Sequence, residues 1–583
     1  MKKVKDFYKK NRKAFENFIF PIFLLLYPLI KLNQGVDVSD STYSLGNYLF
    51  FDRMQGMWVI STYLSNVVGS LLVHLPGGSS LLVMNLYTGL IVSLLALLCF
   101  FLLKKEYPAP IVFLGEVLAI SFCWIPTGIL YNYMTYLFFT LGALLIYFGL
   151  TREKSRYLFF AGLVLGANVM VRFPNLTQAA LILAVWYGSY LYYDKNNNQK
   201  TPNCFLTILQ KTGICFSGYL IGFGIPFLAV AVQYGFGAYG DMMNSLMSIQ
   251  NTDDTYSALS MVTSVIDAYI RSFRFMIVIW IGLLFGIVMF RIAKDRFIIL
   301  KKVMYLAGIV LMLRFLWGRG MFSFRYYEDY SSMFEWGMVL LYLTLAVCIW
   351  MIVSGNCKKT DKVMASIVLV IILITPLGSN NYTCQNLNNL FLAAPFALYG
   401  IYRFCNGVKK NESSFAVISM AAVLVFIITI QSIGFHMQFV FRDGMRGEKR
   451  DTRIEESSSV EGMYTNQDNA EALTGLISFC NEHKLIGQGA VFFGDAPGLS
   501  YILHMPFAIS TSWPDLDSYP TVYFEQELNE LGDSTFILRN VEPATETAVD
   551  KEIFLRNYLQ EKQYQPVYEN DMYTVYQVKE INL

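Results

Sequence analysis

About 13 apolar runs cover most of the first 435 residues, and many approach the roughly 20 residues that a helix needs to cross a bilayer. The bilayer core offers no water to backbone polar groups, so such runs are predicted to be helices, which satisfy these groups internally. The sequence therefore predicts an all-α polytopic membrane bundle of about 13 transmembrane helices. The expected helices lie near residues 16–32, 79–103, 109–126, 134–150, 157–171, 176–193, 212–235, 270–291, 303–318, 333–353, 363–378, 388–405 and 415–435.

Composition agrees with lipid as the main solvent of this chain. Of its 583 residues, 55% are hydrophobic and only 15% are charged, whereas soluble domains carry about 25% charged residues. The net charge of +2 gives no sign of an acidic partner, and we expect no nucleic acid partner.

Lysine and arginine alternate with the predicted helices. If the N-terminus is cytoplasmic, every inner loop is basic or carries a Lys/Arg cluster, while the outer loops are polar, aromatic or acidic, in accord with the positive-inside rule. An odd number of crossings then places the C-terminus outside. The outer loop 33–78 contains a stretch, 61–75, expected to lie in the interface, and the loop 236–269 is expected to be a second interfacial or lid-like excursion.

Composition changes after Phe435. Helical patterns near 468–483, 525–531 and 551–561 alternate with strand patterns near 489–493, 535–538 and 572–578. We therefore predict two domains, a transmembrane bundle over 1–435 and an extracytoplasmic α/β domain over 436–583.

The first outer loop carries Asp37, Asp40 and Tyr43 just beyond the first predicted helix. A carboxylate at the membrane face can act as a general base on an acceptor hydroxyl. A solvated loop acid or a helix cap is the competing interpretation, and both aspartates stay candidates.

Arginines mark two further outer positions. Arg172 ends an apolar helix, where a cation needs a partner such as a lipid phosphate. Arg325 and Tyr326 lie in an aromatic, charged stretch typical of phosphate or sugar binding. Snorkelling to the headgroups and an interfacial aromatic belt are the respective alternatives.

Neutral amides gather at two other outer turns. Asn132 lies in one, and Asn380 and Asn381 lie in the other. Amides donate and accept hydrogen bonds, as sugar hydroxyls require, although each one taken singly is also ordinary turn chemistry. No His/Cys ligand spacing is visible, so we expect no cofactor and no metal site, with a divalent metal left open.

These motifs resemble the GT-C superfamily of polyprenyl-phosphate-sugar-dependent glycosyltransferases, the group of protein O-mannosyltransferases and aminoarabinose transferases. Asp40 and Tyr43 are similar to an Asp-Glu-x-x-Tyr-like motif whose aspartate is the catalytic base, with Ser41 in the place of Glu. The stretch from Gly166 to Arg172 resembles one that binds the donor phosphate, with Arg in the place of Lys. The resemblance implies a GT-C-like bundle that performs inverting sugar transfer on the outer face.

From these patterns we predict a multi-pass membrane glycosyltransferase of the cell envelope, with an aspartate of the first outer loop as general base. Its partners would be membrane lipid, a polyprenyl-phosphate sugar donor, and a glycan, lipid or protein acceptor. The alternatives are a secondary transporter or flippase of lipid-linked sugars, and a non-catalytic scaffold. Against transport, the polar groups gather at one face rather than at the midplane.

Overall fold

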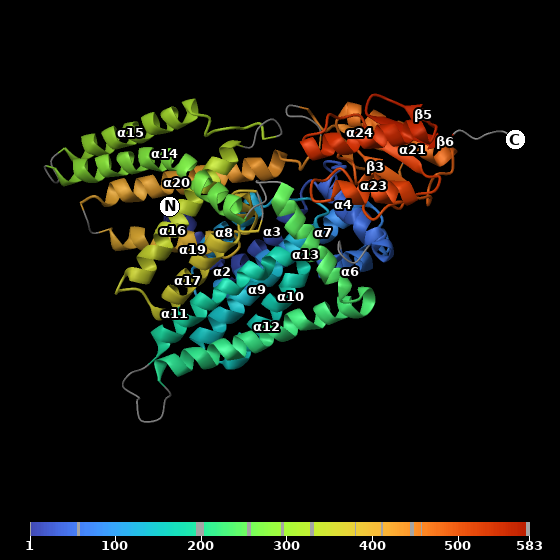
Figure 1. The fold of residues 1–583 in the computed structure, drawn as a ribbon. Coiled ribbons are helices and arrows are strands. Elements are labelled where there is room, and N and C mark those ends of the chain that lie inside the picture. Colours follow the sequence, from blue (N-terminus) through green and yellow to red (C-terminus); the bar gives the residue numbers. More distant parts are fainter. Residues whose placement is uncertain are drawn as a thin grey trace.

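The computed structural model describes residues 2–54, 59–193, 203–252, 258–292, 297–326, 331–378, 381–409, 412–443, 448–455 and 457–578. Helices dominate up to residue 438, and a small sheet domain follows at the C-terminal end (Figure 1). We call residues 448–578 the sheet domain. The predicted boundary near residue 435 stays a prediction, and the last bundle helix, α20, runs over Ser414–Gln438.

Every predicted apolar run contains a helix in the structure. The bundle helices are α3 (Phe20–Leu26), α7 (Leu81–Leu103), α8 (Ala109–Phe122), α9 (Leu130–Thr151), α10 (Ser155–Val171), α11 (Ile182–Tyr192), α12 (Cys204–Tyr234), α14 (Ala258–Arg291), α15 (Ile298–Gly318), α16 (Ser331–Val353), α17 (Lys359–Ile374), α19 (Ala393–Gly407) and α20. The helices α1 (Lys2–Lys10) and α2 (Arg12–Ala14) precede them.

Within the described part of the chain, six helices are long and apolar enough to cross a membrane: α7, α9, α12, Leu259–Arg291 of α14, α16 and α20. Shorter apolar helices accompany them, among them α8 and α10. The chain is thus a multi-pass membrane protein, and the number of 13 crossings stays a prediction.

Small residues bring α10 and α12 into backbone contact. A Cβ at Gly162 or Gly166 of α10, or at Gly218 or Gly222 of α12, would overlap the backbone of the facing helix. Both pairs have the small-xxx-small spacing with which membrane helices approach closely. This packing sets the position of the end of α10, where Arg172 follows.

The two long segments that were predicted to lie outside the membrane contain helices. The first forms α4 (Asp40–Leu49) and α6 (Tyr63–Val73), the latter inside the stretch predicted to lie in the interface. In the segment 236–269, α13 (Gly237–Thr252) occupies the first part, and α14 begins at Ala258 rather than near the predicted residue 270. The interfacial or lid-like role of this segment stays a prediction. Apolar residues at helical spacing, such as Leu259, Val262 and Ile266, extend α14 toward its N-terminus.

The sheet domain has a four-stranded sheet in the order β3-β4-β6-β5. Strand β3 (Ala490–Phe493) pairs parallel with β4 (Thr535–Arg539), and β4 pairs antiparallel with β6 (Tyr573–Val578). The helices α21 (Gln467–Glu482), α23 (Thr521–Glu530) and α24 (Glu546–Glu561) match the predicted ones. Strand β5 (Tyr564–Glu569), the small β1–β2 pair (Thr452–Arg453 and Tyr464–Thr465) and α22 (Leu499–Ile502) were not predicted.

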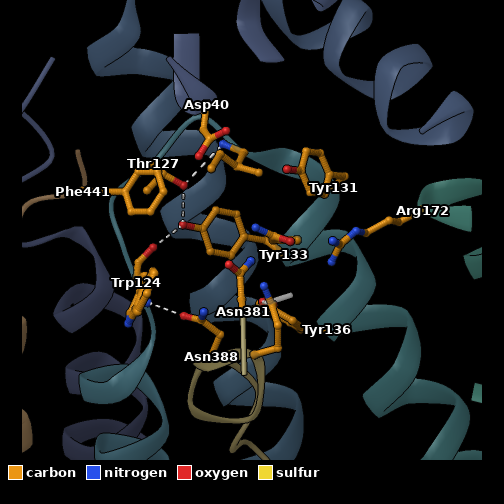
Figure 2. A pocket seen from close by; sticks show the side chains of 13 residues that line it. Asp40, Trp124, Thr127, Tyr131, Tyr133, Tyr136, Arg172, Asn381, Asn388 and Phe441 are labelled. Atoms are coloured by element: carbon orange, nitrogen blue, oxygen red, sulfur yellow. Dashed lines mark hydrogen bonds between the residues drawn. The ribbon is translucent and has the colours of Figure 1, made fainter. Parts of the chain in front are cut away.

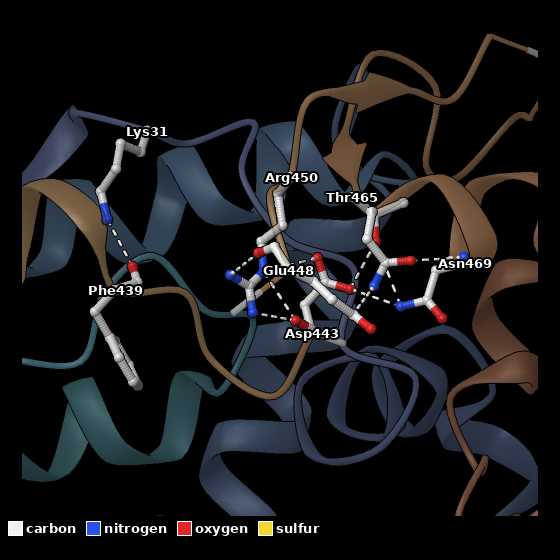
Figure 3. Close-up of polar contacts among 8 residues, drawn as sticks. Lys31, Phe439, Asp443, Glu448, Arg450, Thr465 and Asn469 are labelled. Atoms are coloured by element: carbon white, nitrogen blue, oxygen red, sulfur yellow. Dashed lines mark hydrogen bonds and ion pairs between the residues drawn. The ribbon is translucent and has the colours of Figure 1, made fainter. Parts of the chain in front are cut away.

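A buried polar cluster follows α20 at the junction with the sheet domain (Figure 3). The Asp443 carboxylate accepts hydrogen bonds from Thr465 at 2.7 Å and Asn469 at 3.1 Å, and it pairs with Arg450 at 3.5 Å. On the bundle side, the Lys31 ammonium donates to the Phe439 carbonyl at 2.6 Å. These contacts attach the connecting segment to both parts of the molecule.

The sheet domain also packs directly on α4. The Gly498 N–H donates to the Val38 carbonyl at 2.8 Å, and the Tyr501 hydroxyl donates to the Ser79 carbonyl at 2.6 Å. A Cβ at Gly498 would overlap the Thr42 side chain, so only glycine permits this approach. The start of α4 is therefore held between the bundle and the sheet domain.

Candidate functional site

Asp37 and Asp40, the two candidate bases, lie in different environments. The Asp37 side chain is 4% exposed, and its carboxylate accepts hydrogen bonds from the Ser39 N–H at 2.9 Å, the Ser39 hydroxyl at 2.7 Å and the Ser41 N–H at 2.7 Å. It therefore holds the turn that starts α4. Burial nonetheless raises the pKa of Asp37.

Asp40 is the first residue of α4, and its side chain is partly buried, with an exposure of 31%. Its Oδ2 lies 3.0 Å from the guanidinium of Arg442, which follows α20. Burial raises the pKa of Asp40 to about 6, Arg442 opposes the rise, and the neighbouring Asp37 and Asp495 carboxylates add to it. Asp40 is thus mostly ionised at neutral pH and more basic than an ordinary aspartate.

Arg172 is positioned by the end of α10 and by α6. It is the C-cap of α10 and has extended backbone angles, so the chain leaves the helix there. The next residue, Phe173, donates its N–H to the Ser61 carbonyl at 2.9 Å, and the Ser65 hydroxyl of α6 donates to the Val171 carbonyl at 3.1 Å. The Arg172 guanidinium lies 5.5 Å from the centre of the Tyr131 ring.

A polar network forms the floor beneath these side chains (Figure 2). The Tyr133 hydroxyl donates to the Trp124 carbonyl at 2.7 Å, and the backbone N–H of Trp124 donates to the Asn388 side-chain oxygen at 2.7 Å. Tyr136 of α9 donates to the Gln385 side-chain oxygen at 3.0 Å. Both amides belong to α18 (Cys384–Asn388), the short helix after the predicted amide-rich turn.

These elements enclose a small polar cavity of about 80 Å³, which we call the inner cavity. Asp40 lies at one side of it, Arg172 reaches in from α10, and Asn381 lies near its centre (Figure 2). Four residues predicted as site residues thus line one cavity: Asp40, Asn132, Arg172 and Asn381.

Asp40 also lines a second, larger cavity of about 940 Å³, which we call the outer cavity. Tyr43, Tyr131 and Asn381 line it from the bundle side, Arg442 lines it from the junction, and the sheet domain supplies the rest. Burial raises the pKa of Tyr43, whose ring meets the Trp513 ring edge-on at 5.3 Å. Asp40, Tyr131 and Asn381 are common to both linings.

The remaining predicted residues lie elsewhere. Tyr326 is 2% exposed, and its hydroxyl donates to the Gln431 side-chain oxygen of α20 at 2.5 Å, so it belongs to the packing of the bundle. Arg325 is exposed and lines neither cavity. Asn380 lies outside the described residues.

Sequence reasoning missed the contribution of the junction and of the sheet domain. Arg442, Asp495, Trp513 and Asp515 line the outer cavity but are far from Asp40 in the sequence. One signal existed, because the turn Gly494–Gly498 follows a buried strand, a common place for functional residues. Among the described residues, no group of three or more His, Cys, Asp or Glu side chains is arranged to hold a metal ion.

No family model and no curated protein sequence matches this chain. Among solved structures, the Archaeoglobus fulgidus oligosaccharyltransferase in complex with zinc and sulfate is similar, with a TM-score of 0.47 and 11% identity over 96% of this chain and 73% of the other. The same enzyme tethered with an acceptor peptide has a TM-score of 0.45, with 11% identity and the same coverage.

ArnT from Cupriavidus metallidurans bound to undecaprenyl phosphate is also similar, with a TM-score of 0.34 and 11% identity over 96% of this chain and 97% of the other. With TM-scores below 0.5 and 11% identity, these similarities establish neither a family nor an activity for this chain.

Proposed function

We propose that this chain is a membrane glycosyltransferase that moves a sugar from a polyprenyl-phosphate donor to an acceptor on the outer face. One observation carries the proposal: the Asp40 carboxylate opens into both the inner and the outer cavity. The general base of such a transfer must reach the acceptor hydroxyl on one side while the donor sugar lies on the other side of the base. The pKa of about 6 at Asp40 suits this role at neutral pH.

The proposed donor site is the inner cavity. Arg172 would bind the phosphate through charge-assisted hydrogen bonds, while the isoprenoid tail stays in the bilayer. Among the described residues, no carboxylate forms an ion pair with Arg172, so its guanidinium is available for an anion. Asn132, Asn381, Gln385 and Asn388 offer amide groups to the sugar hydroxyls.

The proposed chemistry is a single displacement. The acceptor hydroxyl gives its proton to Asp40, and its oxygen forms a bond to the anomeric carbon of the donor sugar. The bond from that carbon to the phosphate oxygen breaks, and the electron pair leaves with the polyprenyl phosphate. Attack opposite the leaving group inverts the anomeric centre, and Arg172 stabilises the charge that develops on the phosphate.

Asp37 is the weaker candidate for the base, since its carboxylate accepts hydrogen bonds from Ser39 and Ser41 of the turn that it holds. Arg325 and Tyr326 have no role in the proposed site, because neither lines a cavity with Asp40. Asn380 stays a candidate sugar ligand next to Asn381.

The test uses purified protein in lipid bilayers offered a panel of polyprenyl-phosphate sugars, with release of polyprenyl phosphate as the readout. Asp40→Asn should lower turnover by about 10²- to 10⁴-fold, the usual contribution of a general base. Arg172→Ala should lower it by roughly 10- to 100-fold through the lost charged hydrogen bonds. Arg325→Ala is the matched control and should leave turnover unchanged. Full turnover in Asp40→Asn would contradict the proposal.

One observation favours the transporter alternative. Glu116 of α8 is fully buried in the bundle, and neither of its carboxyl oxygens has a hydrogen-bond partner among the described residues. Ionisable groups inside membrane bundles often mark ion or proton pathways. A transporter would lose substrate flux across liposomes in Glu116→Gln, whereas the proposed transferase would keep its turnover in that variant.

A further inference from the structure

The outer cavity lies where the two parallel strands of the sheet domain end. Phe493 and Gly494 at the end of β3, and Leu538 and Arg539 at the end of β4, all line it. In α/β sheets, ligands bind outside the carboxyl ends of parallel strands, where the loops diverge. The sheet domain therefore presents its most suitable binding edge to Asp40 of the bundle.

The turn after β3 has an unusual backbone conformation at this edge of the sheet. Gly494 has a φ of +90°, and a Cβ there would overlap the carbonyl of Arg539. Asp495 follows with a φ of +52°, uncommon for a residue with a side chain, and its N–H donates to the Asp515 carboxylate at 2.7 Å. Backbone conformations of this kind are concentrated at functional sites, and Asp495 lines the cavity.

The walls of the cavity combine aromatic and polar groups from both parts of the molecule. Tyr43 of α4 and Trp513 of the sheet domain meet edge-on, with an angle of 69° between their rings. Their ring surfaces can pack against the C–H groups of a sugar ring. Carboxylate and guanidinium groups beside them can accept from and donate to hydroxyls.

The charge of the lining separates classes of acceptor. The lining of the outer cavity contains twice as many carboxyl groups as guanidinium groups. An anionic acceptor would meet net repulsion there, because the charges share a partly desolvated space.

The outer edge of β3 is paired at its first residue. The Ala490 N–H donates to the Pro506 carbonyl at 2.9 Å, and the Ala508 N–H donates to the Ala490 carbonyl at 2.9 Å. At Ala490 these bonds leave no place for an extended peptide to add to the sheet edge.

We infer that the outer cavity is the acceptor site and that the acceptor is an uncharged carbohydrate, packed against the Tyr43 and Trp513 pair with one hydroxyl directed to Asp40. This inference rests on the proposed function for the role of the bound sugar as acceptor. Binding of a carbohydrate in the outer cavity needs no donor and can be tested separately.

The experiment is saturation-transfer NMR on the full chain in lipid nanodiscs without donor. The probes are the uncharged trisaccharides maltotriose, cellotriose, mannotriose and chitotriose, with trigalacturonate as the anionic comparison and a Ser/Thr-containing hexapeptide as the peptide comparison. We expect binding of at least one uncharged trisaccharide, and about tenfold weaker binding in Trp513→Ala, which corresponds to the loss of one good contact. Tyr523→Ala, an exposed aromatic of α23 outside the cavity, is the matched control and should bind as the wild type does.

A second variant guards against misfolding of Trp513→Ala. Asp495→Asn keeps the shape of the side chain, and asparagine tolerates the left-handed backbone, so this variant should fold and still bind the trisaccharide more weakly. Binding of trigalacturonate or the peptide in place of the uncharged sugars would overturn the inference, as would binding that none of the cavity variants changes. Sugar binding without any donor turnover would leave the binding site standing and refute the proposed transferase. Turnover with an acceptor other than a carbohydrate would support the proposed transferase and refute the carbohydrate acceptor.

Discussion

The Asp40 carboxylate and the Arg442 guanidinium lie 3.0 Å apart, although Asp40 begins α4 near the N-terminus and Arg442 follows the last helix of the bundle. Arg442 also donates to the Ser39 hydroxyl at 3.2 Å. The polar cluster around the adjacent Asp443 anchors this segment to the sheet domain (Figure 3). The charge that tunes the proposed base therefore comes from the junction between the two parts of the molecule.

This pair predicts how activity depends on pH. Asp40 has a pKa of about 6, so turnover should fall as the pH drops through 6 and the carboxylate becomes protonated. Arg442 lowers this pKa, so Arg442→Ala should raise it and move the acid limb of the pH–rate profile to higher pH. Because Arg442 is half-exposed and solvent screens the pair, we expect a loss of roughly threefold at pH 6 and little change at pH 8.

The control for this experiment is Arg442→Lys, which keeps the positive charge and should leave the acid limb near its original position. An acid limb that does not move in Arg442→Ala, or that moves to lower pH, would show that Asp40 does not set the limb.

Substitutions of Asp37 and Asp40 should have opposite effects on stability and on activity. Asparagine has one side-chain oxygen, so Asp37→Asn must turn its NH₂ group toward one of the N–H groups of Ser39 and Ser41. We expect a loss of about 1–3 kcal/mol in stability, seen as a lower thermal midpoint, while the folded fraction keeps most of its turnover. Asp40→Asn should show the opposite pattern. A fully stable but inactive Asp37→Asn would make Asp37 the base.

The orientation in the membrane that the alternation of charge predicts can be tested with single cysteines. All nine native cysteines are buried or partly buried in the described structure. A membrane-impermeant thiol reagent added to intact cells should label Glu561→Cys, at the end of α24, well above the wild-type background. Lys154→Cys, in the predicted inner loop before α10, should be labelled only after the cells are opened. The reverse labelling pattern would show that the predicted topology is inverted.

The sequence was sufficient for features that depend on local pattern. Apolar runs became helices because the bilayer leaves the backbone no alternative, and Asp40, Asn132, Arg172 and Asn381 meet in one cavity. Charge alternation had assigned all four to the same side of the membrane.

Contacts between distant segments could not be derived in this way. Arg442, Asp495 and Trp513 reach Asp40 only because the sheet domain packs on α4, and no local pattern specifies that packing. Tyr326 is a predicted site residue that the structure places elsewhere. Its aromatic and charged neighbours in the sequence suggested a ligand site, but its backbone N–H and its hydroxyl donate to the glutamines Gln438 and Gln431 of α20.

The contact between the sheet domain and α4 yields the last prediction. In Gly498→Ala the new methyl group would overlap the Thr42 side chain and press on the Val38 carbonyl, so the sheet domain must shift away from α4. Overpacking of this kind costs about 1–3 kcal/mol, and it would also widen the outer cavity beside Asp40. We expect faster proteolysis of the sheet domain from the bundle and lower sugar transfer, while release of the donor sugar to water is retained or increased. Gly532→Ala is the matched control, because a Cβ there meets nothing within 4 Å. If Gly498→Ala transfers sugar as well as Gly532→Ala does, close packing of the sheet domain on α4 is not needed for transfer, and the outer cavity loses its role as the acceptor site.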